Sequence, residues 1–164
     1  MTHAADKGAD PMPSTTSATP ASDQVGIILV THKDYGSALL SAAEMIVGQV
    51  HDCTCINIDS AVEVDEALHR LQEAADLLSR GRGVLVLTDM FGGTPTNLSL
   101  SLMGSRKGAD DVEVLTGVNL PMLLRVLQNR TLPMAELAEK ALASGCEGII
   151  SAGKVLRSKN SDNK

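Results

Sequence analysis

Two short apolar runs, each ending in a polar residue, constrain the fold of this chain more than any other feature. The first extends from Val25 to His32 and the second from Val84 to Asp89. A continuous run of Val, Ile and Leu is typical of a strand buried on both faces, as in a parallel sheet covered by helices. Because sites in open α/β sheets lie at the carboxyl ends of the strands, His32 and Asp89 are candidate functional residues.

The rest of the chain alternates apolar runs with helical patterns, which indicates βαβ connections. We expect helices at 35–47, 64–78, 94–103, from about 121 to 127, and 133–144, and further strands at 53–58, 112–115 and 148–151. The predicted fold is α/β: a three-layer αβα architecture around a mainly parallel, doubly wound sheet of flavodoxin-like order 2-1-3-4.

Composition divides the chain into three parts. We expect residues 1–23, rich in Ser, Thr, Ala and Pro, to be a disordered leader, 24–156 to be one folded domain, and 157–164 to be a polar tail. The formal charge is −6 without a basic block, which argues against nucleic acid or an anionic membrane as the main partner. Without a secretory signal or an apolar stretch of roughly 18–20 residues, the chain is expected to be cytoplasmic.

The cysteines and aromatic residues narrow the possible cofactors. The three cysteines, Cys53, Cys55 and Cys146, are odd in number, and we interpret them as small buried or half-buried apolar residues rather than a disulfide or zinc site. Tyr35 and Phe91 are the only aromatic residues, which disfavours stacking on a base or flavin. The residues require no metal and no cofactor.

The two strand ends and the segment after Asp89 suggest a phosphorylation site. The predicted strand order makes His32 and Asp89 neighbours, and a carboxylate bonded to one imidazole nitrogen leaves the other as a nucleophile. Gly92 and Gly93 allow close approach of backbone N–H groups. Thr94, the expected N-cap of a helix, adds a hydroxyl, so the segment suits a phosphate-sized anion. The combination predicts a histidine that accepts a phosphoryl group.

Each part of this site also has a purely structural interpretation. His32 could be an ordinary hydrogen-bonding residue, Asp89 could cap the following turn, and Gly92-Gly93 is common in turns. Their convergence on one sheet edge favours function. The other histidines lie in polar contexts and are weak candidates: His3, His51 and His69.

Three sequence blocks carry a resemblance to a known family. They are Leu29-Val-Thr-His32, Leu87-Thr-Asp-Met-Phe-Gly-Gly-Thr-Pro-Thr-Asn97 and Thr116-Gly-Val-Asn-Leu-Pro-Met122. Over about residues 24–156 the chain resembles the enzyme IIA (EIIA) domain of the mannose family of the bacterial phosphoenolpyruvate:sugar phosphotransferase system (PTS). The resemblance implies a histidine phosphocarrier of that phosphotransferase system.

The resemblance also implies roles for individual residues. His32 matches the histidine phosphorylated on Nε2 by phospho-HPr, which then passes the group to an EIIB protein, and Asp89 matches the aspartate that orients the ring through Nδ1. Thr94 matches a position usually held by serine near the phosphate. Lys33 stands where glycine is common, so a cation there could stabilise phospho-His32 or alter docking of HPr.

Assembly and docking follow from the same resemblance. Members of the family are typically homodimers whose last strand, here 148–151, reaches the partner's sheet, and they meet a membrane only through a permease. Met90 and Phe91 could form an apolar rim for HPr, although we favour their burial under a neighbouring helix.

Other functions remain open at this stage. An EIIA protein without a permease could signal its phosphorylation state to a regulatory partner, and a relative in a dihydroxyacetone kinase phosphorelay or a binding protein without turnover are further options. A receiver-like domain phosphorylated on Asp89 would need an acidic cluster after the first strand to hold magnesium. That position reads Thr31-His32-Lys33-Asp34, in which only Asp34 is acidic.

Overall fold

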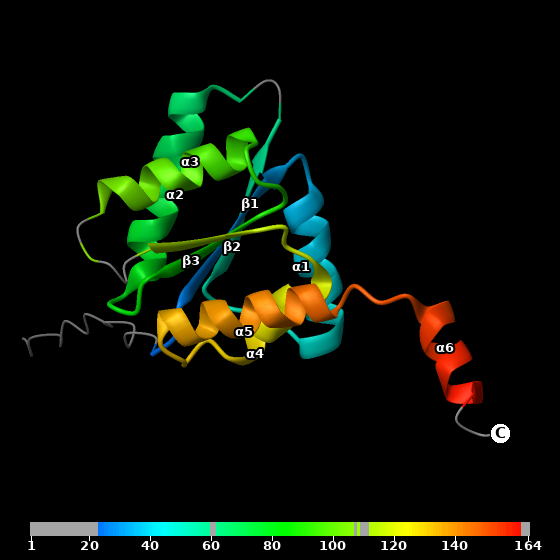
Figure 1. Ribbon diagram of the computed structural model, residues 1–164. Coiled ribbons are helices and arrows are strands. Elements are labelled where there is room, and N and C mark those ends of the chain that lie inside the picture. The colour runs from blue at the N-terminus through cyan, green and yellow to red at the C-terminus, as the bar shows by residue number, and fades with distance from the viewer. Residues whose placement is uncertain (1–22, 60–61, 107, 109–111, 162–164) are drawn as a thin grey trace, which may run out of the picture.

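A parallel sheet forms the centre of the computed structural model, which describes residues 23–59, 62–106, 108 and 112–161 (Figure 1). Its four strands have the order β2-β1-β3-β4. The strands are β1 (Gly26–His32), β2 (Cys53–Ile58), β3 (Val84–Thr88) and β4 (Val112–Thr116). The helices are α1 (Tyr35–Val47), α2 (Val64–Ser79), α3 (Thr94–Ser105), α4 (Leu120–Gln128), α5 (Met134–Glu147) and α6 (Ala152–Ser161).

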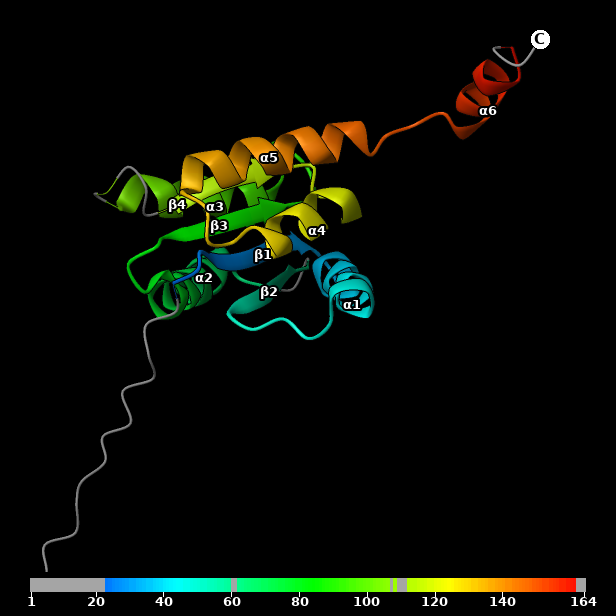
Figure 2. The same cartoon turned by 90° about the horizontal axis from the view of Figure 1, so that it is seen from below.

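Helices cover both faces of this sheet, which matches the apolar character of its central strands up to Thr31 in β1 and Thr88 in β3. The side chains of Ile27 and Leu29 in β1 pack with α1, α4 and α5, whereas Ile28 and Val30 pack with α2 and α3 on the other face. Figures 1 and 2 show the two helical layers with the sheet between them. The predicted three-layer architecture and the strand order 2-1-3-4 are confirmed.

The register of the strands brings the two polar strand ends to one edge. In the parallel pairing of β1 with β3, Val30 is level with Thr88. Asp89, the next residue after β3, is therefore level with Thr31, and His32 lies one residue further along.

The start of α3 differs from the prediction. The N-cap is Gly93, in an extended conformation, and Thr94 is already the first helical residue without a side-chain capping bond. By contrast, Asn119 caps α4 through its side chain, which accepts a hydrogen bond from the Met122 amide at 3.0 Å. The helix therefore begins one residue earlier than predicted.

The segment 148–151, predicted to be the last strand and to reach a partner's sheet, does not form a strand within the single chain. Helix α5 continues to Glu147, and the segment after Gly148 has no strand structure before α6 begins at Ala152. A strand requires a hydrogen-bonding neighbour, whereas this segment leads away from the sheet (Figures 1 and 2). Ile149 and Ile150 are 81% and 66% exposed as a result.

The two chain ends are described only in part. The expected leader, apart from Asp23, lies outside the described residues, and so do residues 162–164 of the expected tail. Helix α6 includes the beginning of that tail, up to Ser161. No helix within 23–59, 62–106 and 112–161 is long and apolar enough to cross a membrane.

The cysteines occupy two different environments. Cys53 and Cys55 lie on the same face of β2, half-buried against the α1 side of the core, whereas Cys146 is exposed on α5. The expected burial is thus wrong for Cys146, which lies on the outer surface of its helix. Burial raises the pKa of the Cys53 thiol to about 12, with a further contribution from Cys55.

Candidate functional site

His32 and Asp89 form a direct pair at the carboxyl edge of the sheet. The ring Nδ1 of His32 lies 2.8 Å from Oδ2 of Asp89, and the His32 backbone amide donates to the same oxygen at 3.0 Å. The His32 side chain is 45% exposed, whereas that of Asp89 is only 17% exposed. The imidazole is therefore accessible to solvent, whereas the carboxylate that holds it is more buried.

The charge of Asp89 determines the tautomer of His32. Partial burial opposes ionisation of this carboxyl, but hydrogen bonds from the backbone and ring of His32 outweigh it and hold the pKa of Asp89 below its usual value. An ionised carboxylate only accepts hydrogen bonds, so the proton of this contact is on Nδ1 of His32. In the neutral ring Nε2 then carries a lone pair and is the nucleophilic atom.

The loop after Asp89 closes against the imidazole. A β-carbon placed on Gly93 would lie 2.9 Å from Cε1 and 3.4 Å from Nε2 of His32. The backbone at 93 thus approaches the reactive edge of the ring more closely than any side chain would allow. Gly92 has a φ of +82°, in the left-handed region that favours glycine. The site therefore favours glycine at both positions, at 93 because of the close approach to the ring and at 92 because of the positive φ.

Buried threonines hold this loop in place. Thr96 donates its hydroxyl proton to the Met90 carbonyl at 2.6 Å, and its oxygen lies 2.9 Å from the Thr88 hydroxyl, which must then donate to it. The amide of Met90 also donates to Oδ1 of Asp89 at 3.0 Å. Sequence reasoning missed Thr96. The sequence feature that could have identified it is a hydroxyl residue at a position of α3 that faces the core, where a buried hydroxyl needs a hydrogen-bond partner.

A pocket opens beside the imidazole. It has a volume of about 480 Å³ and is lined by His32, Lys33, Ile58, Asp59, Val62, Val64 and Thr94. A second hollow of about 250 Å³ shares Val64 and Thr94 and continues along α3 to Ser101. Together they form a groove, polar near His32 and apolar toward α2. The predicted phosphate-binding residue Thr94 lies at the junction of the two hollows.

Met90 and Phe91 project from the site into solvent. They are 55% and 76% exposed, so the favoured prediction of burial is wrong. The loop that carries them is fixed from its inner side by Thr96, which leaves these two side chains on the outside. They are free to contact a partner that approaches His32.

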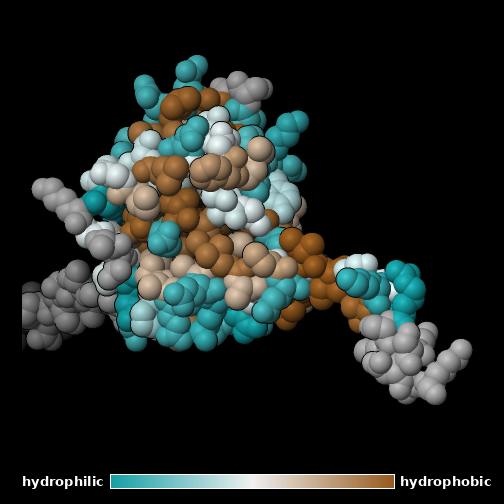
Figure 3. All heavy atoms as spheres, in the orientation of Figure 1, coloured by the Kyte–Doolittle hydropathy of each residue, from teal (hydrophilic) through white to brown (hydrophobic). Residues whose placement is uncertain are grey.

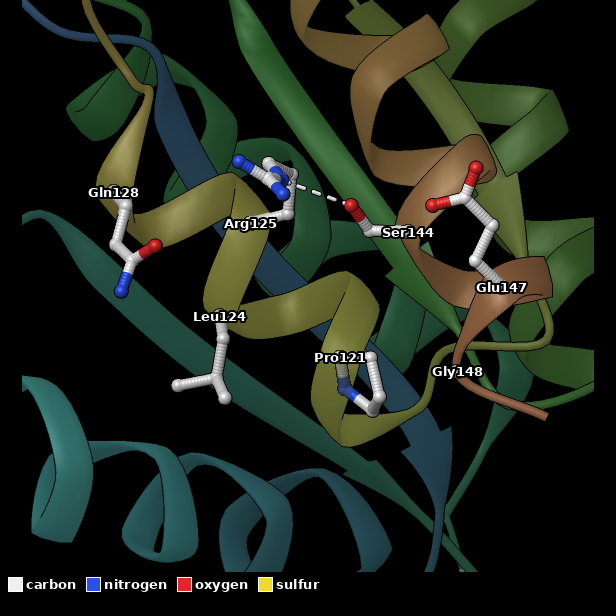
Figure 4. A pocket seen from close by; sticks show the side chains of 7 residues that line it. All are labelled: Pro121, Leu124, Arg125, Gln128, Ser144, Glu147 and Gly148. Carbon is white, nitrogen blue, oxygen red and sulfur yellow. Dashed lines mark hydrogen bonds between the residues drawn. The ribbon is translucent and has the colours of Figure 1, made fainter. Parts of the chain in front are cut away.

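A different hollow lies between α4 and α5. Figure 4 shows its lining, in which the Arg125 side chain points toward Ser144. Nε of Arg125 donates to the Ser144 hydroxyl at 2.8 Å, and the volume is about 320 Å³. It contains no paired histidine and carboxylate, so it lacks the chemistry found at His32. Across the described residues, no group of three or more His, Cys, Asp or Glu side chains is arranged as metal ligands.

Comparison with known proteins identifies a family and relatives for most of the folded part. The model of the EIIA-man family, described as the PTS system fructose IIA component, matches residues 26–142. The sorbose-specific EIIA component of the PTS from Lacticaseibacillus casei is 35% identical over 103 residues, which cover 63% of this chain and 72% of that relative. The mannose-specific EIIAB component from Escherichia coli strain K12 is 28% identical over 137 residues, 82% of this chain. The match spans 40% of the length of that EIIAB protein.

Solved structures agree with this grouping. The crystal structure of phosphotransferase system component EIIA from Streptococcus agalactiae superposes with a TM-score of 0.72 and 31% identity, covering 79% of this chain and 98% of that one. The mannose/sorbose-specific IIA subunit from Enterococcus faecalis gives a TM-score of 0.67 and 25% identity, over 78% and 94% of the two chains. The fold and its sequence relatives thus lead to the same class of protein.

Proposed function

We propose that this chain, which belongs to the mannose family of PTS enzyme IIA proteins, is a phosphocarrier that receives its phosphoryl group on Nε2 of His32. The observation that carries the proposal is the contact of 2.8 Å between His32 Nδ1 and Asp89 Oδ2. It fixes the tautomer and leaves Nε2 as the nucleophile at the exposed edge of the ring.

The transfer step balances without a cofactor. The lone pair of Nε2 attacks the phosphorus of a donor phosphohistidine, a new N–P bond forms, and the donor nitrogen keeps the electron pair of the bond that breaks. The Nδ1 proton stays between His32 and Asp89. As Nε2 gives up its lone pair, positive charge develops on the ring, and the Asp89 carboxylate stabilises it.

The start of α3 supplies the groups that would bind the phosphoryl oxygens. The first N–H groups of a helix have no partner within the helix and carry partial positive charge. Helix α3 begins at Thr94, directly after Gly93, whose backbone lies against the His32 ring. We assign Gly92, Gly93 and Thr94 to phosphate binding on this ground.

The partners we propose are HPr as donor and an EIIB protein as acceptor. The name of the Escherichia coli relative joins EIIA and EIIB in one protein, which supports EIIB as the acceptor. The exposed Met90 and Phe91 beside His32 are the apolar contacts that we propose for these partners. An EIIB acceptor would use the phosphoryl group for carbohydrate uptake. In the alternative role, the acceptor is a regulatory partner that responds to the phosphorylation state of this protein.

Phosphorylation of Asp89 itself is the weaker alternative. Both of its carboxylate oxygens already accept hydrogen bonds from the protein, one from Met90 and the other from His32. The Asp89 side chain is 17% exposed and that of His32 is 45% exposed, so a phosphoryl donor reaches the imidazole more readily than the carboxylate. The geometry therefore favours His32 as the acceptor.

We further propose that two copies associate through residues 148–151. Strand β4 is an edge of the sheet and pairs only with β3 among the described strands. Ile149 and Ile150 are exposed where the chain leaves α5, and Figure 3 shows apolar surface between the body of the molecule and α6. An exposed apolar segment and an open sheet edge each favour pairing between copies.

Transfer of radiolabel tests the phosphocarrier. We expect label from phosphoenolpyruvate, enzyme I and HPr to appear on the wild-type protein and to be lost in acid but to survive alkali. His32→Ala should remove it, whereas His69→Ala, an exposed histidine on α2, should not. Label that persists in His32→Ala, or no label on the wild type, would contradict the proposal.

A further inference from the structure

Lys33, the residue after His32, has an unusual backbone conformation. Its φ of +49° lies in the left-handed region, which costs a residue with a β-carbon free energy that glycine avoids. Its amide donates to the Ile58 carbonyl at 2.8 Å, so the end of β2 holds this conformation in place. Strained residues that the surrounding structure fixes are often found where a side chain must be presented to a site.

The side chain of Lys33 contributes to the lining of the site. It lines the same pocket as His32 and Thr94, and among the described residues of that lining it alone carries a positive charge. It is exposed and makes no ion pair with a described residue. The lining also includes the carboxylate of Asp59.

A phosphoryl group on His32 would enter an acidic environment. It brings a charge of about −1.5 to −2 at neutral pH, and the Asp89 carboxylate already contacts the same ring. Asp59 lines the pocket and Asp34 follows Lys33 in the chain. Because like charges repel at short distance, the phosphorylated state needs a nearby cation more than the unphosphorylated state does.

Resting on the proposed function, the geometry points to Lys33 as a phosphoryl-binding residue that selectively stabilises phospho-His32. Its ammonium group donates charge-assisted hydrogen bonds to the phosphoryl oxygens, which do not exist before transfer. Lys33 thereby shifts the transfer equilibrium from the donor toward this protein. The strained backbone places a charge beside His32 where a glycine would leave none.

The transfer equilibrium between phospho-HPr and this protein tests the inference. The two purified proteins are mixed without enzyme I, and ³¹P NMR integrals give the ratio of the two phosphohistidines. We expect Lys33→Gln to shift this ratio about three- to tenfold toward phospho-HPr. Lys33→Arg should stay near the wild type because the charge remains. Lys140→Gln removes a charge on α5, far along the chain from the site, and serves as the control.

Salt dependence and folding provide two further readouts. Added salt should lower the ratio of phospho-His32 to phospho-HPr more in the wild type than in Lys33→Gln. Salt screens the charge of Lys33, which the variant lacks. The melting temperature of unphosphorylated Lys33→Gln should match the wild type, since both side chains carry a β-carbon at the same φ.

An unchanged equilibrium in Lys33→Gln would overturn the inference. The same holds if only the rate of transfer falls while the final ratio is kept, because Lys33 would then assist docking of HPr rather than bind the phosphoryl group. Failure of the proposed function is distinct, since the wild-type protein would then take up no phosphoryl group on His32.

Discussion

One carboxylate oxygen of Asp89 accepts two hydrogen bonds from His32, one from the backbone amide at 3.0 Å and one from the ring Nδ1 at 2.8 Å. The first bond fixes the end of β1 against the end of β3. The second fixes the rotation and tautomer of the ring. A single side chain thus couples the geometry of the sheet edge to the reactivity of Nε2.

Removing the charge of Asp89 should slow phosphoryl transfer. Asp89→Asn keeps an oxygen that accepts hydrogen bonds but no longer stabilises positive charge on the ring, so we expect the rate of phosphorylation to fall about 10- to 100-fold. Initial rates of label transfer from phospho-HPr measure this. A rate equal to that of the wild type would show that the carboxylate charge plays no part.

The same residue should make stability depend on acid pH. The pKa of Asp89 is lowered in the fold, so its ionised form contributes stability above its ordinary pKa of 3.8, and this contribution is lost as pH falls through the lowered value. The difference in free energy of unfolding between wild type and Asp89→Asn should therefore shrink as pH falls below about 4. Urea unfolding at pH 7 and at pH 3 measures it, and a difference that grows in acid would contradict the assignment.

A methyl group at position 93 should displace the imidazole. Gly93→Ala places a β-carbon 2.9 Å from Cε1 of His32, closer than real contacts allow. The ring must move, and we expect phosphoryl transfer to fall at least about tenfold, because misplacement by 1 Å has large effects on rate.

Gly104→Ala is the matched control for Gly93→Ala. Gly104 lies in α3, and a β-carbon added there would meet nothing within 4 Å. Alanine at this position should leave transfer unchanged and stabilise the helix by about 0.5–1 kcal/mol. Equal transfer rates for the two alanine variants would mean that close packing of residue 93 on the ring is unimportant.

A charge in the exposed segment after α5 should weaken self-association. Ile150 is 66% exposed in the single chain, and we expect Ile150→Asp to shift the protein from dimer to monomer in sedimentation velocity experiments. Leu77→Asp, on the exposed face of α2 at 68% exposure, is the control. If the wild-type protein is a monomer at high micromolar concentration, the proposed association of two copies through residues 148–151 is wrong.

The sequence was sufficient to predict the sheet and the central pair. The apolar runs ending at His32 and Asp89 are long, uninterrupted and buried on both faces, so their identity as β1 and β3 depends on local pattern alone. Their adjacency then follows from the flavodoxin-like strand order 2-1-3-4 that we predict for a doubly wound sheet. The contact between the two side chains is a direct consequence.

Other features depend on contacts that no local pattern reports. The exposure of Phe91 depends on how Thr96 holds the loop from within, and the close approach of the Gly93 backbone to the His32 ring joins residues that are distant in sequence. Ile149 and Ile150 have the pattern of a strand, but a strand forms only where a neighbour exists. These features depend on tertiary contacts, which the intrinsic helix and strand propensities of the residues do not report.

The most direct test of the central claim is ¹⁵N NMR of histidine-labelled protein after phosphorylation by enzyme I and HPr. We predict phosphorus on Nε2 of His32, with Nδ1 still protonated toward Asp89. The His32 resonances should change while those of His51 and His69 do not. Phosphorus on Nδ1 of His32, on another histidine, or on a carboxylate would contradict it.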